Sequence, residues 1–405
     1  MRALRAGGVW RVSMRVNHLI GGALGMALAA VTAVAPARAE NGVTANTIEF
    51  GQVAALDGPA AALGRGMRDG LRAAFAEANK AGGVAGHKLE LISRDDGYEP
   101  DKSIAAAKQL LDQDKVFALI GSVGTPTSVA VQPIAAAEGA PFIGAFTGAE
   151  FLRTPYKPNV VNVRASYFQE TETMVEHLTK DLGVTRIAIF YQDDAYGQAG
   201  LEGVKRALGK RHMQLVSQGT YERNTTAVKS ALLSIRKGDP QAVIMIGAYR
   251  PSAEFIKFAH AIRLNATFVN ISFVGADALA KAVGPAGAGV VVTEVVPFPE
   301  DKSVPIVARY LAALHAAEPD VKPNFVSLEG YIVGRLAVMG LEKINGPITR
   351  QALLDAIAKT GTFDLGGMHL VYGPSDNRGS SEVFLTVIQP DGSVKPVTRL
   401  AAAGG

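Results

Sequence analysis

Residues 48–96 read IEFGQVAALDGPAAALGRGMRDGLRAAFAEANKAGGVAGHKLELISRDD, and this stretch decides the fold class. The apolar run 48–53 predicts a strand that stops at the turn 57–59, and apolar residues recur at helical spacing over 64–80. A double glycine ends that helix, and residues 88–92 predict a second strand. Such a crossover predicts a parallel sheet, in which ligands collect at the carboxyl ends of the strands. We therefore look for function in the loops that follow the strands.

The same strand-helix-strand pattern starts again in the middle of the chain, with strands at 186–191 and 213–217 around a helix at 199–208. This repetition predicts two similar α/β halves rather than one sheet. Further strands are expected at 116–121, 141–144, 159–163, 242–247 and 272–275. Three late helices are expected at 304–316, 325–343 and 349–359, followed by a hairpin of 382–388 and 394–398.

Residues 1–39 have the pattern of a secretory signal peptide: arginines, an apolar run over 19–35, and the small-x-small sequence Ala37-Arg38-Ala39. We predict cleavage after Ala39, with Met1 or Met14 as the true start, and a periplasmic location. The segment holds five of the 41 Lys and Arg and none of the 37 acidic residues, so the mature chain has 36 basic against 37 acidic residues. Nothing then indicates a nucleic-acid partner, which needs clustered basic residues on the mature domain.

The chain contains 0 cysteines, which excludes disulfides, thiolate metal sites and a thiol-linked lipid anchor. Residues 40–405 are too many for one ordinary core and suit two domains. We expect a freely diffusing monomer.

Motifs for catalysis or cofactor binding are missing from the sequence. Gly64, Gly66 and Gly70 miss the dinucleotide-binding spacing by one residue, and neither a phosphate-binding loop nor a serine nucleophile elbow occurs. The histidines of the mature chain form no pair at ligand spacing. The pairs 95–96 and 193–194 are interpreted as turn aspartates at strand ends. We expect no catalysis, no metal and no cofactor.

Hydroxyl-bearing loops follow two strands of the first half. In 121–126, Thr125 is expected to cap a helix that starts at Pro126, and 144–148 ends in Thr147 and Gly148. Free N–H groups at such a helix start attract an anion. The two loops could bind a carboxylate, although ordinary helix capping explains them equally well.

Three residues of the second half are expected at the same kind of edge: Tyr196, Tyr249 and Asp277. A carboxylate opposite an anion-binding loop would complete a site for a zwitterion, with tyrosine rings excluding water.

Several short motifs, in this order, resemble the leucine/isoleucine/valine-binding family of periplasmic solute receptors. They are Gly58-Pro59 before Gly64, Asn79-x-x-Gly82-Gly83-Val84-x-Gly86, Asp95-Asp96, Ile120-Gly121, Asp194-x-Tyr196-Gly197, Gly247-x-Tyr249 and Gly275-x-Asp277. The resemblance implies an α/β fold of two doubly wound parallel-sheet lobes joined by three crossings, which close on a ligand and deliver it to an inner-membrane ABC permease. We place lobe 1 at 40–164 plus 298–375 and lobe 2 at 165–297 plus 376–405.

The resemblance also implies roles for single residues. Thr125 falls where the family contacts the amino-acid carboxylate, and Thr147 or Gly148 falls at a second such contact. Tyr196 and Tyr249 match aromatic wall positions, while Asp277 matches an acid that takes the ammonium group.

Some positions depart from the family's branched-chain receptors. Asp277 replaces a glutamate, Leu63 replaces a tyrosine, Phe146 adds bulk, and a cysteine pair of some members appears as Tyr98 and Gly124. We therefore expect an amino acid or a related small carboxylate or amide, without naming one. The alternative is a periplasmic sensing module that signals to a membrane receptor.

Overall fold

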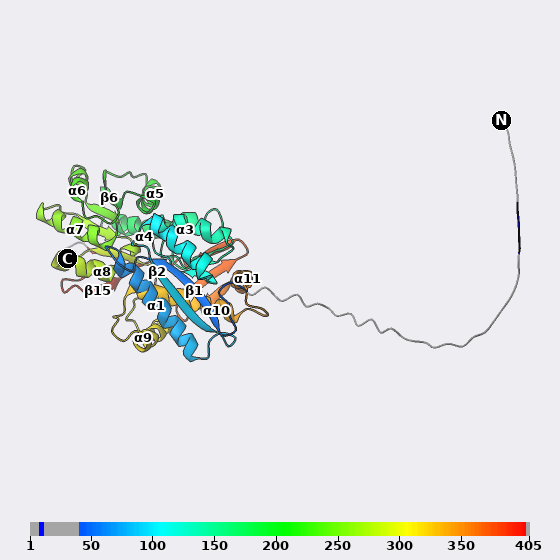
Figure 1. Ribbon diagram of the computed structural model, residues 1–405. Coiled ribbons are helices and arrows are strands. Elements are labelled where there is room, and N and C mark those ends of the chain that lie inside the picture. The colour runs from blue at the N-terminus through cyan, green and yellow to red at the C-terminus, as the bar shows by residue number, and fades with distance from the viewer. Residues whose placement is uncertain (1–7, 12–39, 402–405) are drawn as a thin grey trace, which may run out of the picture. The chain divides into compact units, whose positions relative to one another are not determined.

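The computed structural model describes residues 8–11 and 40–401. Most of the predicted signal peptide, residues 1–7 and 12–39, lies outside the described residues, as do 402–405. The described body from residue 40 onward is an α/β structure with two main sheets (Figure 1). Among the described residues, no helix has both the length and the apolar character needed to cross a membrane.

Lobe 1 is built on a parallel sheet of five strands in the order β2-β1-β3-β4-β5. These are β1 (Thr47–Ala54), β2 (Lys88–Asp95), β3 (Ala118–Ile120), β4 (Phe142–Ile143) and β5 (Val160–Val161). The opening unit β1-α1-β2 is confirmed, with Ile48 opposite Leu89 in the register. Its helices are α1 (Ala61–Lys80), α2 (Pro100–Lys108), η1 (Gln109–Gln113), α3 (Thr125–Ala137), η2 (Glu150–Leu152), α9 (Pro305–Ala317), α10 (Phe325–Glu342) and α11 (Arg350–Thr360).

Two glycines let α1 and α10 cross with their backbones in contact. A Cβ added at Gly70 would lie 2.0 Å from the Ser327 carbonyl oxygen, and one added at Gly330 would lie 2.3 Å from the Met67 carbonyl oxygen. Real Cβ atoms do not approach oxygen so closely, so larger residues would force the helices apart. The crossing fixes α10, whose first turns face lobe 2.

Lobe 2 is built on a sheet of seven strands in the order β15-β14-β10-β9-β8-β6-β7. The parallel strands are β6 (Ile187–Gln192), β7 (Ser217–Tyr221), β8 (Ala242–Ile246), β9 (Thr267–Asn270) and β10 (Val291–Glu294). The predicted tail hairpin is confirmed as β14 (Phe384–Ile388) and β15 (Val394–Val397), and it adds antiparallel strands beside β10. The helices are α4 (Tyr167–Lys180), α5 (Ala195–Gly209), α6 (Lys229–Arg236), α7 (Tyr249–Ala261), η3 (Ser272–Val274), α8 (Ala276–Val283) and η4 (Gly284–Gly287).

Two strand predictions in lobe 2 are wrong in position. The segment 272–275 is the 3-10 turn η3 rather than a strand, because the chain leaves the sheet after Asn270 and Ile271. The segment 213–217 lies before β7, which starts at Ser217. Helix α4 follows the first crossing and was not predicted at all.

A small third sheet lies between the late helices and the tail hairpin. It contains β11 (Thr362–Asp364), β12 (His369–Gly373) and β13 (Asp376–Gly379), and the Asn162 N–H next to β5 donates to the Asn377 carbonyl at 2.9 Å. Since β13 contacts lobe 1 and β14 belongs to the lobe 2 sheet, we propose that the third crossing lies at 380–383. The other two crossings then follow β5 and β10.

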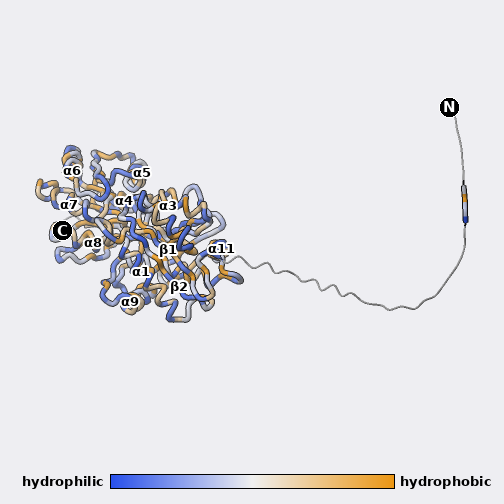
Figure 2. Tube along the Cα trace, in the orientation of Figure 1, coloured by the Kyte–Doolittle hydropathy of each residue, from blue (hydrophilic) through white to orange (hydrophobic). Residues whose placement is uncertain are grey.

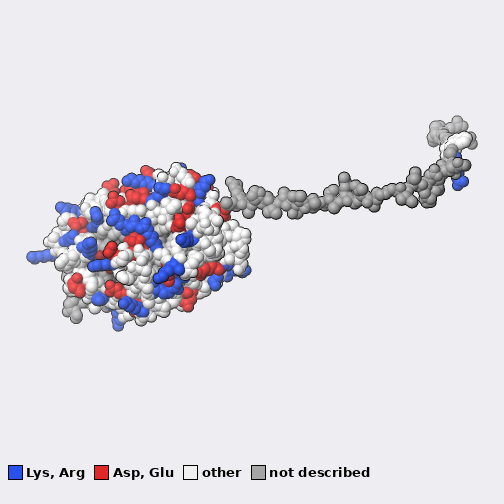
Figure 3. Space-filling model, turned by 60° about the horizontal axis from the view of Figure 1, so that its bottom comes forward, with Lys and Arg blue, Asp and Glu red and all other residues white. Residues whose placement is uncertain are grey.

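Buried apolar side chains run continuously from one lobe to the other. Figure 2 shows apolar and polar segments alternating along the chain throughout the body. The main core cluster joins Phe50 and Leu71 of lobe 1 to Phe190 and Ile244 of lobe 2. Basic and acidic side chains are interspersed over the face drawn in Figure 3, in keeping with the near balance of charge in the mature chain.

Candidate functional site

Three buried hydroxyls meet where the strand ends of lobe 1 approach α4, and we call Thr125, Thr147 and Tyr167 the hydroxyl cluster. The Oγ1 atoms of Thr125 and Thr147 lie 2.7 Å apart, and the Thr147 hydroxyl donates to the Tyr167 hydroxyl at 3.4 Å. The Ala149 N–H donates to Thr147 Oγ1 at 3.2 Å. Two hydrogen bonds among three hydroxyls leave one O–H without an acceptor in the described part of the chain. The cluster can therefore donate to one more acceptor.

Glycines shape the loop that presents Thr125. The backbone turns with positive φ at Gly121 (61°) and at Gly124 (106°), and Gly124 then occupies the N-cap position of α3. Thr125 was predicted as this cap, but it is the first helical residue, so its side chain is free to join Thr147. The Thr127 hydroxyl closes the turn by donating to the Val123 carbonyl.

The loop after β4 holds the start of α4. The Tyr167 N–H donates to the Gly148 carbonyl at 2.7 Å, and a Cβ at Gly148 would lie 2.5 Å from Tyr167 Cδ1. Gly148 therefore packs against the tyrosine of the cluster, and only glycine leaves room there.

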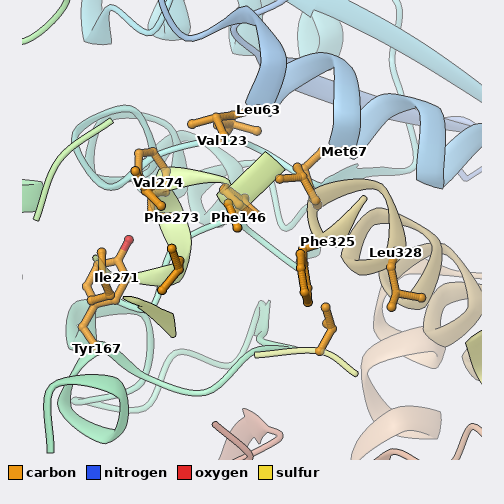
Figure 4. Packing of buried hydrophobic residues seen from close by; sticks show 14 of the residues in the cluster. Leu63, Met67, Val123, Phe146, Tyr167, Ile271, Phe273, Val274, Phe325 and Leu328 are labelled. Carbon is orange, nitrogen blue, oxygen red and sulfur yellow. The ribbon is translucent and has the colours of Figure 1, made fainter. Parts of the chain in front are cut away.

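Aromatic rings from both lobes pack over the hydroxyl cluster. Phe273 of η3 enters lobe 1 between Tyr98 and Phe146, with ring centroids at 5.9 and 5.4 Å, and it lies 4.5 Å from Tyr196. The Tyr167 ring lies 5.7 Å from that of Tyr196. Figure 4 shows Phe273 and Phe146 in the same part of the interface, with Leu63 and Val123 above them in the view. All five rings are buried, so the lobes are closed on each other.

The structure joins some predicted site residues to this aromatic cluster and not others. Phe146 and Tyr196 belong to it, and Leu63 faces lobe 2, because a Cβ at Gly275 would lie 2.8 Å from Leu63 Cδ2. Tyr249 is mostly buried at the start of α7 but makes no ring contact with another aromatic side chain of the described residues.

Residues that sequence reasoning missed include Tyr98, Phe273 and Tyr167. Tyr98 was noted only as a substitute for a cysteine, and a Cβ on Gly124 would lie 2.3 Å from its ring, so the two positions are neighbours. Phe273 fell inside the misplaced strand. Phe273 could have been found from the sequence as an aromatic residue that lies just beyond the end of a strand.

Asp277 lies in the first turn of α8, at the mouth of the interface between the lobes. Its carboxylate accepts from the Phe325 N–H at the start of α10, at 3.4 Å. Asp277 is exposed to solvent, and partial desolvation by the surrounding protein raises the pKa of its carboxyl, against the opposing effect of that hydrogen bond.

A second set of polar contacts crosses between the lobes. Arg223 donates to Glu99 at 2.9 Å, and the Asn224 amide donates to Glu99 at 2.7 Å and to the Gly97 carbonyl at 3.0 Å. The Gln192 amide donates to the Tyr98 hydroxyl at 3.2 Å. These bonds can form only when the lobes are closed.

A buried ion pair lies under the aromatic rings. Arg164 of the first crossing donates from Nε and Nη2 to Glu329 of α10 at 2.9 and 2.8 Å, and both side chains are at most 2% exposed. The guanidinium carbon of Arg164 lies 4.2 Å from the Phe146 ring centroid. Arg164 Nη1 is buried and has no hydrogen-bond partner among the described residues.

Two cavities border the interface between the lobes. One of 510 Å³ is lined by Thr125 and by residues of η2 and α5, including Phe151, Ala199 and Leu201. A larger one of 1270 Å³ follows the first and third crossings and is lined by side chains of both charges. Across residues 8–11 and 40–401, no group of three or more His, Asp or Glu is arranged to hold a metal ion.

Comparison with known proteins agrees with this architecture. The family model described as periplasmic binding protein matches residues 47–393. The chain belongs to this family, in its leucine/isoleucine/valine-binding branch.

Two of the following three relatives match most of the length of this substrate-binding protein, and the third matches 50% of it. A possible leucine/isoleucine/valine-binding protein from Rhodopirellula baltica SH 1 is 40% identical, with a TM-score of 0.83 over 89% of this chain and 98% of that one. The Leu/Ile/Val-binding protein BraC3 of Rhizobium johnstonii is 24% identical over 76% of this chain and 83% of its own length. A Leu/Ile/Val-binding protein homolog 3 of Brucella melitensis is 28% identical, and the match spans 54% of that protein. The family resemblance and the two-lobed α/β fold expected from the sequence are thereby confirmed.

Proposed function

We propose that this substrate-binding protein captures an amino acid or a related small carboxylate or amide between its lobes, and delivers it to an inner-membrane ABC permease. The observation that carries the proposal is the hydroxyl cluster, which keeps an unused O–H donor under rings from both lobes. A donor in a closed, dry site suits an anionic or carbonyl oxygen.

A second unused donor supports a carboxylate in particular. Arg164 Nη1 is buried without a partner in the described chain. Burial raises the pKa of the Tyr167 hydroxyl, and the nearby charge of Arg164 opposes that rise without cancelling it. A hydroxyl and a guanidinium N–H are the donors that a carboxylate can use together.

The predicted site residues take the following proposed roles. Thr125 and Thr147, with the backbone at Gly148, hold the acid group; Tyr196, Tyr249, Phe146 and Leu63 form the wall; Asp277 faces the amine. The named ligands of the relatives, leucine, isoleucine and valine, fit this arrangement of a polar end and an apolar wall.

Ligand exchange requires the lobes to separate, because the aromatic cluster is buried and the contacts of Arg223 and Asn224 bridge the lobes. We propose that closure is a population shift, in which the ligand favours the closed state because it contacts both lobes at once.

The experiment is a thermal-shift screen of amino acids, aromatic acids and short amides, followed by calorimetry, since a ligand that binds only the folded state must raise the melting temperature. Thr125→Val and Thr147→Val are expected to lose about 10-fold in affinity for each hit, the value of a hydrogen bond to a charged group. If both variants bind the hits as tightly as the wild type, the hydroxyl cluster is not the acid site.

We also propose that the protein is exported to the periplasm by its signal peptide, acts in ligand import and is a monomer. The signal peptide is tested by sequencing the N-terminus of the exported protein, which should begin at Glu40. The alternative of a sensing module predicts that deletion of the gene abolishes a signalling response to the ligand while uptake of labelled ligand continues. Loss of uptake on deletion supports the importer.

A further inference from the structure

Glu294 ends β10 as a buried acid that the described chain leaves without a partner. The residue is 2% exposed, and its Oε1 accepts no hydrogen bond from any described residue. Such a group costs stability unless a donor reaches it. Sequence reasoning passed over Glu294 because it lies inside the apolar run 289–296.

Asn270, at the end of the neighbouring strand β9, is a second unpartnered polar residue. It is 0% exposed, and neither its Oδ1 nor its Nδ2 has a partner among the described residues. Asn270 lies opposite Val292 in the parallel register, and alternate residues of a strand share a face, so Glu294 lies on the same face as Asn270. Two neighbouring strand ends thus present unsatisfied polar groups to one side of the sheet.

Glu294 is the fourth residue at or just after a strand end of lobe 2 that we place near the ligand. Strands β6, β8 and β9 are followed by Tyr196, Tyr249 and Asp277, and β10 ends in Glu294 itself. Beyond it the chain crosses to lobe 1, where Phe298 packs edge-on against Phe325 of α10 at 5.8 Å. Glu294 therefore lies where the strand ends of lobe 2 meet the first turns of α10.

The charged groups around Glu294 come from four elements: Asp277 of α8, Glu170 of α4, Arg164 of the first crossing and Glu329 of α10. Most of these have partners. Glu170 accepts from the Ser272 N–H and hydroxyl, both at 3.0 Å, and from the Thr293 hydroxyl at 2.6 Å, while Glu329 is paired with Arg164. Asp277 accepts from the Phe325 N–H. Glu294 is the acid of this group with no donor in the described chain.

We propose that Glu294 is a ligand-binding residue, which receives the ammonium group of an amine-bearing ligand together with Asp277, with the Asn270 amide as a further contact. The inference rests on the proposed function, and it narrows the ligand class to primary amines that carry an acid group. An ammonium supplies three N–H donors and one positive charge, which match two carboxylates and a carboxamide oxygen.

The same placement predicts a proton linkage. Burial raises the pKa of the Glu294 carboxyl well above its usual range, with the nearby charge of Asp277 acting in the same direction, so the empty closed site favours the protonated form. An incoming ammonium favours the ionised carboxylate, and the proton leaves to the buffer. An amine ligand therefore releases protons on binding, whereas the same acid without the amine does not.

The test compares matched probes on the full mature chain by calorimetry at pH 7, in two buffers of different ionisation enthalpy. The probes are L-leucine with 4-methylpentanoate, and L-phenylalanine with 3-phenylpropanoate, each pair differing in the amine. The expected result is that an amine probe binds with proton release, and that Glu294→Gln lowers its affinity about 10- to 100-fold, the effect of losing a charged hydrogen bond. The affinity of the acid without the amine should change by less than about 3-fold.

Controls separate this role from a structural one. Gln has the shape of Glu and is neutral, so the melting temperature of ligand-free Glu294→Gln should equal or exceed that of the wild type. Asp277→Asn is expected to lose less affinity for the amine probes than Glu294→Gln does. Glu254→Gln, which removes a surface ion pair with Lys257 on α7, should leave the affinity for every probe unchanged.

Three results would overturn the inference: equal binding of an acid and its amine partner, wild-type affinity in Glu294→Gln, or no binding of either amine probe. The first two leave the proposed function intact if Thr125→Val still weakens every probe that binds. Loss of that Thr125 effect would instead contradict the proposed function.

Discussion

Arg164 and Glu329 form a two-point ion pair, with donor-acceptor distances of 2.9 and 2.8 Å, that joins the first crossing to α10 across the buried centre of the protein. The pairing raises the pKa of Arg164 despite its burial, because Glu329 stabilises the positive charge. Each partner alone would be an uncompensated buried charge. The pair thus ties the segment that follows β5 to α10.

Removal of one partner is predicted to cost more than removal of both. Glu329→Gln or Arg164→Met should lower the free energy of unfolding by about 3–5 kcal/mol, and the double variant Arg164→Met/Glu329→Leu should recover most of that loss. Urea denaturation followed by circular dichroism measures these values. The exposed pair Lys180–Glu176 is the control, where single changes should cost less than about 1 kcal/mol. A double variant as unstable as the sum of the singles would contradict the prediction.

The contacts of Arg223 with Glu99 and Asn224 with Gly97 exist only between closed lobes, so they should influence closure rather than folding. Glu99→Ala, which removes the acceptor of both Arg223 and Asn224 and leaves the Arg223–Asp194 pair inside lobe 2, is predicted to weaken ligand binding by roughly 3-fold, the scale of a partly exposed ion pair, with little change in the melting temperature. Small-angle scattering of the ligand-free variant should give a larger radius of gyration than the wild type. Arg186→Ala, which breaks the exposed pair with Asp239, should leave both quantities unchanged.

Gly70 and Gly209 are helical glycines in opposite surroundings. Gly70→Ala places a methyl group 2.0 Å from the Ser327 carbonyl oxygen and should destabilise the protein by about 1–3 kcal/mol or more, because α1 and α10 must separate. At Gly209, the last residue of α5, an added Cβ meets nothing within 4 Å, so alanine should stabilise by about 0.5–1 kcal/mol. Thermal unfolding of the two variants measures both the expected loss and the expected gain of stability. Equal effects would mean that the helix crossing tolerates a side chain.

The sequence predicts features that depend on neighbouring residues better than features that depend on contacts between distant parts of the chain. Periodicity found α1 and the late helices, because a local pattern of apolar residues decides which face is buried. Helix α4 was missed although it begins with a capping box of Ser166 and Gln169, a signal that local reasoning could have used.

The site was predicted less completely than the fold, for a physical reason. Strand ends located Thr125 and Thr147, but the partners of a strand-end residue come from the other lobe. That Phe273 meets Phe146, and that Glu294 faces α10, depends on how the two lobes close.

Asp96 gives a prediction for the pH dependence of stability. Burial raises the pKa of this fully buried carboxyl to about 6 from 3.8, against hydrogen bonds from the Tyr98 N–H and the Ser103 hydroxyl. The native state then binds more protons than the unfolded state between about pH 4 and pH 6, so this contribution to stability is present at low pH and is lost as the pH rises through that window. The loss amounts to about 3 kcal/mol at most.

Asp96→Asn should therefore flatten the dependence of the unfolding free energy on pH between about 4 and 6, measured by urea denaturation at each pH. Asp320, which is exposed, supplies the control: Asp320→Asn should keep the wild-type slope. An unchanged slope in Asp96→Asn would show that the buried carboxyl titrates normally.

Phe273 belongs to lobe 2 by sequence and to the interface by contact, so its loss should change ligand choice as well as stability. Phe273→Ala removes a fully buried ring that touches Tyr98, Phe146 and Tyr196, and it should destabilise the closed protein by about 3–5 kcal/mol. The space left between the lobes should admit larger acids in a thermal-shift screen. Phe255→Ala, which removes a ring whose centroid lies 4.4 Å from that of Phe190 inside lobe 2, should lower the melting temperature similarly without altering the order of ligand preference. If both variants shift preference alike, Phe273 acts through general stability, and the wall of the site lies elsewhere.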